Sequence, residues 1–169
     1  YSAYLPDNFQ WQNASGKTYN IEALVHQAIQ RDPVKEIEGG THHLYGIARA
    51  LNRFGKSARP APVWQEADLY LRSYAMRAER YQQPDGAFSA RIFARPASTK
   101  RPAKLVHSSG HMLEWLAVFL TKEELREPWV QNAVHRLLLT IENNPLDSFS
   151  IGGITHAVHA LKLYRDKIL

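Results

Sequence analysis

The sequence predicts an all-α fold in which six helices pair into three helical hairpins. Two observations support this prediction. Apolar residues recur at the three- and four-residue spacing of an amphipathic helix along most of the 169 residues. The helical stretches also repeat two alternating sequence patterns. We expect residues 1–16 to form an irregular lead-in, and residues 17–169 to form one repeat domain whose hairpins lie along an arc.

The composition is that of an ordinary globular domain, with 44% hydrophobic and 22% charged residues. The absence of cysteine excludes disulfides and cysteine-bound metal sites. The net charge is +5, but the basic residues are scattered rather than collected on one helix face, so nucleic-acid binding is not expected. No apolar stretch approaches the roughly 20 residues of a membrane span, so a membrane partner is not expected either.

Proline and glycine mark the ends of the first three predicted helices. The first has its apolar stripe at residues 21–29 and ends before Pro33, because proline disfavours a helical residue in front of it. The second follows Gly39-Gly40 and ends near Gly55. The third spans residues 62–81 and begins with a proline, which is favourable in the first turn of a helix.

A long interruption is predicted at residues 84–107, beginning with the turn Pro84-Asp85-Gly86. Within it, residues 87–93 favour a short hairpin strand, the one β element that we expect. The fourth helix is predicted to open where the interruption ends, at Ser108-Ser109-Gly110.

The last two helices are bounded by similar signals. Thr121 and Glu124 have the spacing of a capping box, which marks a helix start. The fifth helix begins at Pro128 and stops at the Asn-Asn-Pro sequence of residues 143–145, and the sixth follows Gly152-Gly153.

The odd-numbered and even-numbered helices each carry a recurring residue. An alanine marks the odd-numbered helices: Ala23, Ala67 and Ala133. A histidine marks the start of the even-numbered helices: His43, His111 and His156. The spacings in both sets agree with a repeat of about 45 residues that carries one insertion of about 22. That insertion is the interruption at residues 84–107.

Two segments carry a resemblance to a known group of proteins. Residues 83–89, Gln-Pro-Asp-Gly-Ala-Phe-Ser, resemble the Gln- and Asp-Gly-containing segment of the squalene-cyclase and prenyltransferase repeats. Residues 110–115, Gly-His-Met-Leu-Glu-Trp, are similar to the Gly-His-x-x-Glu-Trp segment of N-acylglucosamine 2-epimerases. The resemblance implies half of an α/α toroid, with the even-numbered helices on the inside of the ring. The lack of cysteine excludes the zinc-dependent prenyltransferase and lanthionine-cyclase activities.

The three repeated histidines and Glu114 are the candidate catalytic residues. In a toroid, His43, His111 and His156 would share one rim, where the positive ends of the helix dipoles would keep them neutral. A neutral imidazole is suited to general base catalysis. Glu114, one turn from His111, is placed to orient that ring or to act as a second acid–base group. The alternative is that the histidines cap their helices.

No metal site and no cofactor are predicted. His107 and His111 are four residues apart, which is the spacing of two metal ligands on one helix. The expected helix start at Gly110 separates them, so this spacing is not taken as a metal signal.

Arg91, Arg95 and Trp115 are the candidate ligand-binding residues. The two arginines lie in the 84–107 insertion, which has no acidic residue after Asp85. It is either a lid over an anionic ligand or a solvated loop. Trp115 is either part of the core or a platform for a sugar ring.

Two functions from different classes fit these observations. The chain is a structural or interaction module of a larger protein, or it is a carbohydrate-active epimerase or lyase domain that uses histidine acid–base chemistry. A small polar or sugar-like molecule is the expected ligand. An arc of hairpins exposes apolar faces at both ends, and the chain begins without methionine. We therefore also expect helices of a longer parent chain, or a homodimer partner, to cover those faces.

Overall fold

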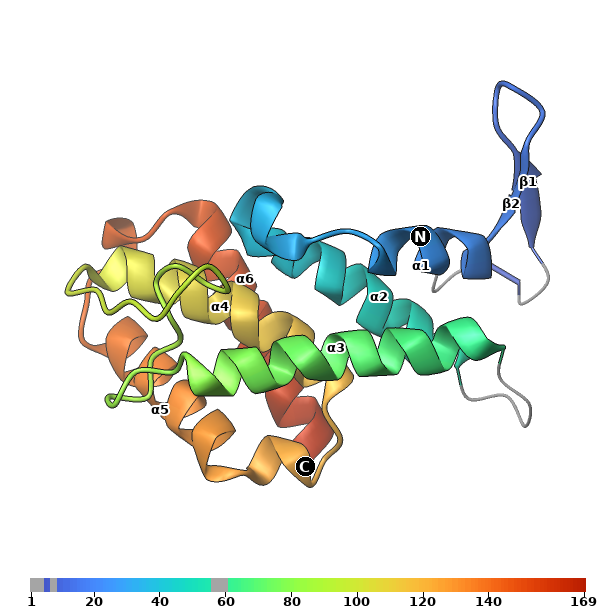
Figure 1. Ribbon diagram of the computed structural model, residues 1–169. Helices are drawn as coiled ribbons and strands as arrows, with labels where there is room; N and C mark the ends of the chain where they lie inside the picture. Colours follow the sequence, from blue (N-terminus) through green and yellow to red (C-terminus); the bar gives the residue numbers. More distant parts are fainter. Residues whose placement is uncertain (1–4, 7–8, 56–60) are drawn as a thin grey trace.

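The structure confirms the all-α fold. It is a computed structural model that describes residues 5–6, 9–55 and 61–169. This part of the chain forms six α-helices and one small sheet, and Figure 1 shows how they are arranged. The helices are α1 (Ile21–Ile29), α2 (Thr41–Phe54), α3 (Pro62–Arg80), α4 (Pro102–Phe119), α5 (Pro128–Glu142) and α6 (Ile151–Ile168). The strands are β1 (Gln10–Gln12) and β2 (Thr18–Asn20).

The predicted proline and glycine starts of three helices are confirmed. α3 and α5 begin at Pro62 and Pro128. α2 begins directly after Gly40, which adopts a left-handed conformation with φ 70°. A Cβ on Gly40 would lie 2.4 Å from the Cβ of Pro33, so only glycine fits both the backbone angle and the space.

The predicted capping box is also present. The backbone N–H of Thr121 donates to the carboxylate of Glu124 at 2.8 Å, and the backbone N–H of Glu124 donates to the Thr121 hydroxyl at 3.2 Å. The box starts a short 3-10 turn, Glu124–Arg126, rather than α5 itself. Leu125, inside this turn, is fully buried and anchors it to the core.

The predicted start of the fourth helix is wrong. α4 begins at Pro102, so the interruption ends at Arg101 and residues 102–107 are helical. The prediction took Gly110 for a helix start, but this glycine lies inside α4 and allows close packing against α6. Ser108 fits within the buried helix because its hydroxyl donates to the Lys104 carbonyl at 2.9 Å.

The described residues contain strands only near the N-terminus. β1 and β2 form an antiparallel hairpin that projects from the helical body (Figure 1). Its strands pair Trp11 with Tyr19, whose rings stack with their centroids 6.1 Å apart. Part of the expected irregular lead-in is therefore ordered as a strand. Residues 87–93, expected to form a strand, instead form turns that bury Phe88 and Phe93.

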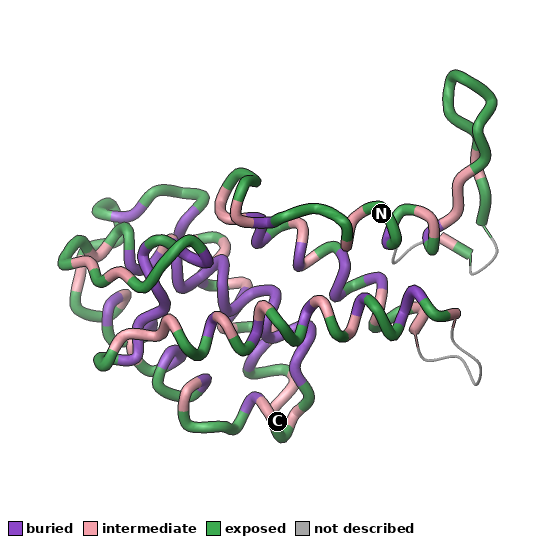
Figure 2. The backbone as a smooth tube through the Cα atoms, viewed as in Figure 1, coloured by how far each residue is buried: buried purple, intermediate pink, exposed green. Residues whose placement is uncertain are grey.

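Helix α4 lies at the centre of the helical body. It packs most extensively against α6, next against α2 and then against α5. Every residue from Leu105 to Phe119 except His107 is buried. Buried segments accordingly gather in this part of the molecule in Figure 2, whereas the β-hairpin is mostly exposed. The even-numbered helices therefore lie side by side, with α4 between α2 and α6.

Among the described α-helices, apolar side chains are most exposed on α3 and α6. Helix α3 exposes Leu69 and Met76, and α6 exposes Ile151 and Val158. Each pair is seven residues apart and so shares one helix face. Within the described ranges, no helix is both long enough and apolar enough to cross a membrane.

Candidate functional site: a histidine centre on three helices

Three imidazole rings from three different helices meet at one place. His42 is on α2, His111 on α4 and His156 on α6. The ring centroids of His111 and His156 are 4.0 Å apart. The ring centroid of His42 lies 5.1 Å from that of His111 and 4.9 Å from that of His156. We call these three residues the histidine centre. It is assembled by the packing of α4 between α2 and α6.

Hydrogen bonds fix the orientation of the two inner rings. Nδ1 of His111 lies 2.8 Å from the backbone carbonyl oxygen of His107, which can only accept, so this nitrogen carries the proton. Nδ1 of His156 likewise donates a hydrogen bond, to the carboxylate of Glu114 at 2.9 Å. In a neutral imidazole only one nitrogen is protonated, so Nε2 of each ring carries a free lone pair.

Glu114 supports the centre from within the core. Its side chain is only 9% exposed. One oxygen accepts the hydrogen bond of His156, and the other accepts one from Nδ1 of His159 at 2.6 Å. His156 and His159 are one turn apart on α6, so a single carboxylate holds both rings. A buried carboxylate is costly unless it is paired in this way.

A second pair extends the centre along α4. Nε2 of His107 lies 2.6 Å from the carboxylate of Glu38, and the His107 and His111 ring centroids are 4.5 Å apart. Burial raises the pKa of Glu38, but the hydrogen bond and the charge of His107 outweigh it, so the pKa lies below its ordinary value. Glu38 has φ 53°, an unusual conformation for a residue other than glycine. Such backbone strain often occurs at functional sites.

The lowered pKa of His111 favours the neutral ring at pH 7, but its cause differs from the expected one. Burial is the main effect that lowers its pKa, to about 4. The hydrogen bond to the carbonyl of His107 opposes this, and the neighbouring His156, His107 and His42 add to it. The expected cause was a helix N-terminus. Because α4 begins at Pro102, His111 lies in the middle of the helix, where the dipole effect is weak.

His43 was expected in the cluster and lies outside it. Its Nε2 donates to the carbonyl of Ala28 at 2.9 Å, and its ring faces Tyr70. Adjacent helical residues point about 100° apart, so only one of His42 and His43 can face α4. His42 takes that place. A clue was present in the sequence, since Thr41-His42 matches Thr155-His156 at a similar distance after a glycine pair.

Two sets of three side chains among the described residues bring potential metal-ligand atoms within 4.8 Å of one another. The first is His42, His111 and His156, and the second is Glu38, His107 and His111. Of these residues, Glu38 was not identified from the sequence, and His107 was considered as a metal ligand but set aside. The four-residue spacing of His107 and His111 was a sequence signal for His107. It was rejected because the helix start was wrongly placed at Gly110, between the two residues.

Trp115 cannot serve as a platform for a sugar ring. It is fully buried, and its ring packs beside those of Phe93 and Phe119 at centroid distances of 6.2 Å. This expectation is corrected: Trp115 belongs to the core.

Arg91 and Arg95 line a hollow at the surface. The hollow has a volume of about 820 Å³ and lies beside the start of α4. Its lining also includes Gln83, Arg101 and Lys104, and no acidic residue. The insertion and the first turn of α4 together place four cationic side chains around one space.

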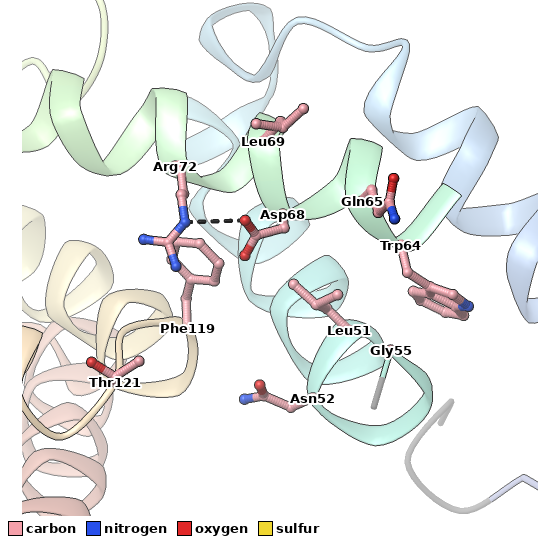
Figure 3. A pocket seen from close by; sticks show the side chains of 10 residues that line it. All are labelled: Leu51, Asn52, Gly55, Trp64, Gln65, Asp68, Leu69, Arg72, Phe119 and Thr121. Atoms are coloured by element: carbon pink, nitrogen blue, oxygen red, sulfur yellow. Dashed lines mark hydrogen bonds and ion pairs between the residues drawn. The ribbon is translucent and has the colours of Figure 1, made fainter. Parts of the chain in front are cut away.

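A second hollow, of about 520 Å³, lies between α2, α3 and the end of α4 (Figure 3). Its principal charges neutralise one another, since Arg72 donates to Asp68 at 3.0 Å and to Glu124 at 2.7 Å. Most of the remaining lining is apolar or uncharged, including Leu51, Trp64 and Phe119. This hollow offers no acid–base pair or ligand set, so the histidine centre is the better candidate for chemistry.

Comparisons with models of known families, with characterised proteins and with solved structures find no significant match to this chain.

Proposed function

We propose that this chain is a catalytic module that transfers protons at the histidine centre to and from a small acidic, sugar-like substrate. The observation that carries the proposal is the convergence of His42, His111 and His156, with Glu114 buried behind them. Clusters of histidine and carboxylate groups in contact with one another are typical of acid–base sites.

The hydrogen bonds favour this function over a capping role. His111 lies in the middle of α4. His156 is held by a side chain, Glu114, rather than by a backbone group of its own helix. Of the three histidines first considered, His43 acts as a helix cap, since it binds the end of α1 through the Ala28 carbonyl. His111 also binds a backbone carbonyl, that of His107, but this bond lies within α4 and leaves its Nε2 towards His42 and His156 unused.

The basic hollow supports an acidic substrate. Lys104 lines the hollow, and His107 and His111 follow it at intervals of three and four residues, so all three share one side of α4. Lys104 and His111 are seven residues apart, or about 10 Å along the helix axis. A carboxylate, sulfate or phosphate in the hollow would therefore place the body of a sugar-sized molecule beside the centre.

The chemistry that fits is abstraction of a proton from a carbon atom next to a carboxylate. Return of the proton to the opposite face gives epimerisation, and loss of a neighbouring leaving group gives elimination. Both reactions need a base that is unprotonated near pH 7, which the centre provides.

An interaction module is the second candidate. The exposed pairs Leu69 with Met76 and Ile151 with Val158 favour contact with further helices or with a second copy. The side-by-side packing of α2, α4 and α6 is compatible with half of an α/α toroid, and we retain that arrangement as part of the proposal. Light scattering of the purified chain over a range of concentrations tests for self-association.

The catalytic proposal is tested with a panel of uronic acids, N-acyl amino sugars and their neutral counterparts. Ligand-observed NMR reports binding, deuterium incorporation from D₂O reports proton abstraction, and ultraviolet absorbance reports an unsaturated product. We expect exchange or elimination with an acidic member of the panel, and a loss of about 10²–10⁴-fold in His111→Gln. His135→Gln, an exposed histidine on α5, is the matched control. Lowered melting temperature in His42→Gln, His111→Gln and His156→Gln, with no ligand for the wild type, would support the structural alternative.

A further inference from the structure

We propose that the histidine centre binds one divalent transition-metal ion, with zinc as the preferred ion. His42, His111 and His156 each supply one ring nitrogen, and a water molecule takes the fourth position. This inference deepens the proposed function by naming its proton-transferring group. Metal binding itself is measured without any substrate, so the two proposals can fail separately.

The hydrogen bonds of the inner rings are those of metal-binding histidines. Such histidines almost always donate their second N–H to a carboxylate or a backbone carbonyl, which fixes the ring and the protonated nitrogen. His111 donates from Nδ1 to the His107 carbonyl, and His156 donates from Nδ1 to Glu114. Both Nε2 atoms therefore keep a lone pair with which they could bind an ion. Glu114 also supplies a negative charge to offset the charge of the ion.

The distances fit after a small adjustment. The ligand atoms of the three histidines already lie within 4.8 Å of one another. Zinc–nitrogen bonds of 2.0–2.1 Å in a tetrahedron place the nitrogens about 3.3 Å apart. His42 is the exposed member of the set, so its ring can turn towards the ion while the buried His111 and the half-buried His156 stay in place.

The ligand types select the class of metal. Imidazole nitrogens favour zinc and its transition-metal neighbours, whereas magnesium and calcium prefer oxygen ligands. Three protein ligands with an open fourth position are typical of catalytic zinc, and structural zinc usually has four. The exposure of His42 gives the fourth position access to solvent.

The alternative set, Glu38 with His107 and His111, fits an ion less well. His107 and Glu38 already bind each other at 2.6 Å, so an ion would have to replace that hydrogen bond. The carbonyl of His107 meanwhile orients His111 for the first set. We therefore assign to His107 and Glu38 the role of positioning residues.

The bound ion would provide the base. Zinc lowers the pKa of its water to about 7, so the water releases a proton to solvent and becomes hydroxide. The hydroxide would accept the substrate proton and become water again. The carbanion left on the substrate would then take up a proton on its opposite face or expel its neighbouring leaving group, and neither outcome needs an oxidant or a reductant. In this form His111 holds the ion and does not itself take up the proton.

The test is metal binding by chelator-treated protein in the absence of substrate. Zinc is titrated by calorimetry, and cobalt(II) is titrated by its visible absorption, which distinguishes tetrahedral from octahedral sites. We expect one ion per chain and a tetrahedral cobalt spectrum. His42→Gln, His111→Gln and His156→Gln should each weaken binding by more than about 100-fold, and Glu114→Gln by about 10–100-fold. His135→Gln should bind as the wild type does, and circular dichroism checks that each variant is folded.

The outcomes separate the hypotheses. Absence of stoichiometric binding by the wild type, or equal binding by all variants, would overturn the metal site. Loss of binding in His107→Gln and Glu38→Gln, with retention in His42→Gln and His156→Gln, would place the ion in the alternative set and also overturn it. His42→Cys offers a thiolate in place of the imidazole and should restore zinc binding relative to His42→Gln. Activity that survives chelation would refute the role of the ion while leaving the proposed function in place. A chain that binds the metal but acts on no sugar would support the metal site and refute the proposed function.

Discussion

Gly110 of α4 lies directly against the backbone of Ala157 of α6. A Cβ on Gly110 would come within 2.8 Å of the Ala157 nitrogen and 2.9 Å of its Cα. Each residue has a histidine of the centre beside it in sequence, His111 after Gly110 and His156 before Ala157. The close approach of the two helices therefore brings these two rings together.

The first prediction is that Gly110→Ala destabilises the protein and weakens the histidine centre. Alanine in place of glycine inside a helix normally stabilises by about 1 kcal/mol. Here the added methyl group meets backbone atoms that cannot move aside without separating α4 from α6, which costs about 1–3 kcal/mol. Urea unfolding measures the change. Gly46→Ala is the matched control, because Gly46 lies within α2 with nothing close to its Cβ position. Equal stabilisation by both substitutions would contradict the packing argument.

The second prediction concerns the carboxylate of Glu114. In Glu114→Gln the amide oxygen can still accept from one histidine, but the amide NH₂ then faces the Nδ1–H of the other. One buried polar group is left unsatisfied, so unfolding should become easier by about 1–3 kcal/mol. The NMR signals of the His156 and His159 ring protons should shift together. Glu142→Gln, at an exposed position on α5, should leave both stability and spectra unchanged. A change confined to one of the two rings would show that the carboxylate does not hold both.

The third prediction is a pH dependence of stability that comes from Glu124. Burial raises its pKa, but the hydrogen bonds from Thr121 and the contact with Arg72 lower it further, so the folded pKa lies below the ordinary value of 4.5. The unfolded chain then binds the proton more tightly. The stabilisation is complete above about pH 4.5 and is lost as the pH falls through the folded pKa.

Urea unfolding at pH 7 and pH 3 measures this contribution. Glu124→Gln should lose about 0.5–2 kcal/mol at pH 7, from the cap and the ion pair, and much less at pH 3. Glu123→Gln, an exposed neighbour, should behave as the wild type at both values. An equal loss at both pH values would show that the charge of Glu124 is not responsible.

The fourth prediction concerns the basic hollow. Arg91→Gln with Arg95→Gln should weaken binding of an acidic sugar by roughly tenfold, which corresponds to about 1.4 kcal/mol. Raising the salt concentration should weaken binding by the wild type more than by the double variant, because the lost contacts are electrostatic. Lys17→Gln, in the distant β-hairpin, removes one positive charge elsewhere and serves as control. Unchanged affinity and salt dependence in the double variant would exclude the hollow as the anion subsite.

Much of the fold was predictable because local signals set it. Pro62 and Pro128 begin helices, and Gly40 adopts a conformation that favours glycine. The start of α4 was missed because Gly110 serves a contact with α6. The sequence alone does not distinguish a glycine that allows contact with a neighbouring helix from a glycine that begins a helix.

The candidate site was predictable only in part. His111 and His156 were identified because each stands at a fixed place in the repeat, and Glu114 because it lies one helical turn from His111. The choice between His42 and His43 depends on how α2 is rotated about its axis, and tertiary packing decides that rotation. Glu38 reaches His107 across many residues of sequence through an unusual backbone angle, for which the sequence carries no local signal.

The burial of α4 has a consequence for how the molecule opens. A helix enclosed from Leu105 to Phe119 cannot expose its amides by fraying, so their hydrogen exchange should require global unfolding. The amides of the β-hairpin should instead exchange through local opening. An ion bound at His111 would stabilise the folded state by about 2.7 kcal/mol at a hundred times its dissociation constant. It should therefore slow exchange along all of α4 by about a hundredfold and leave the hairpin unaffected.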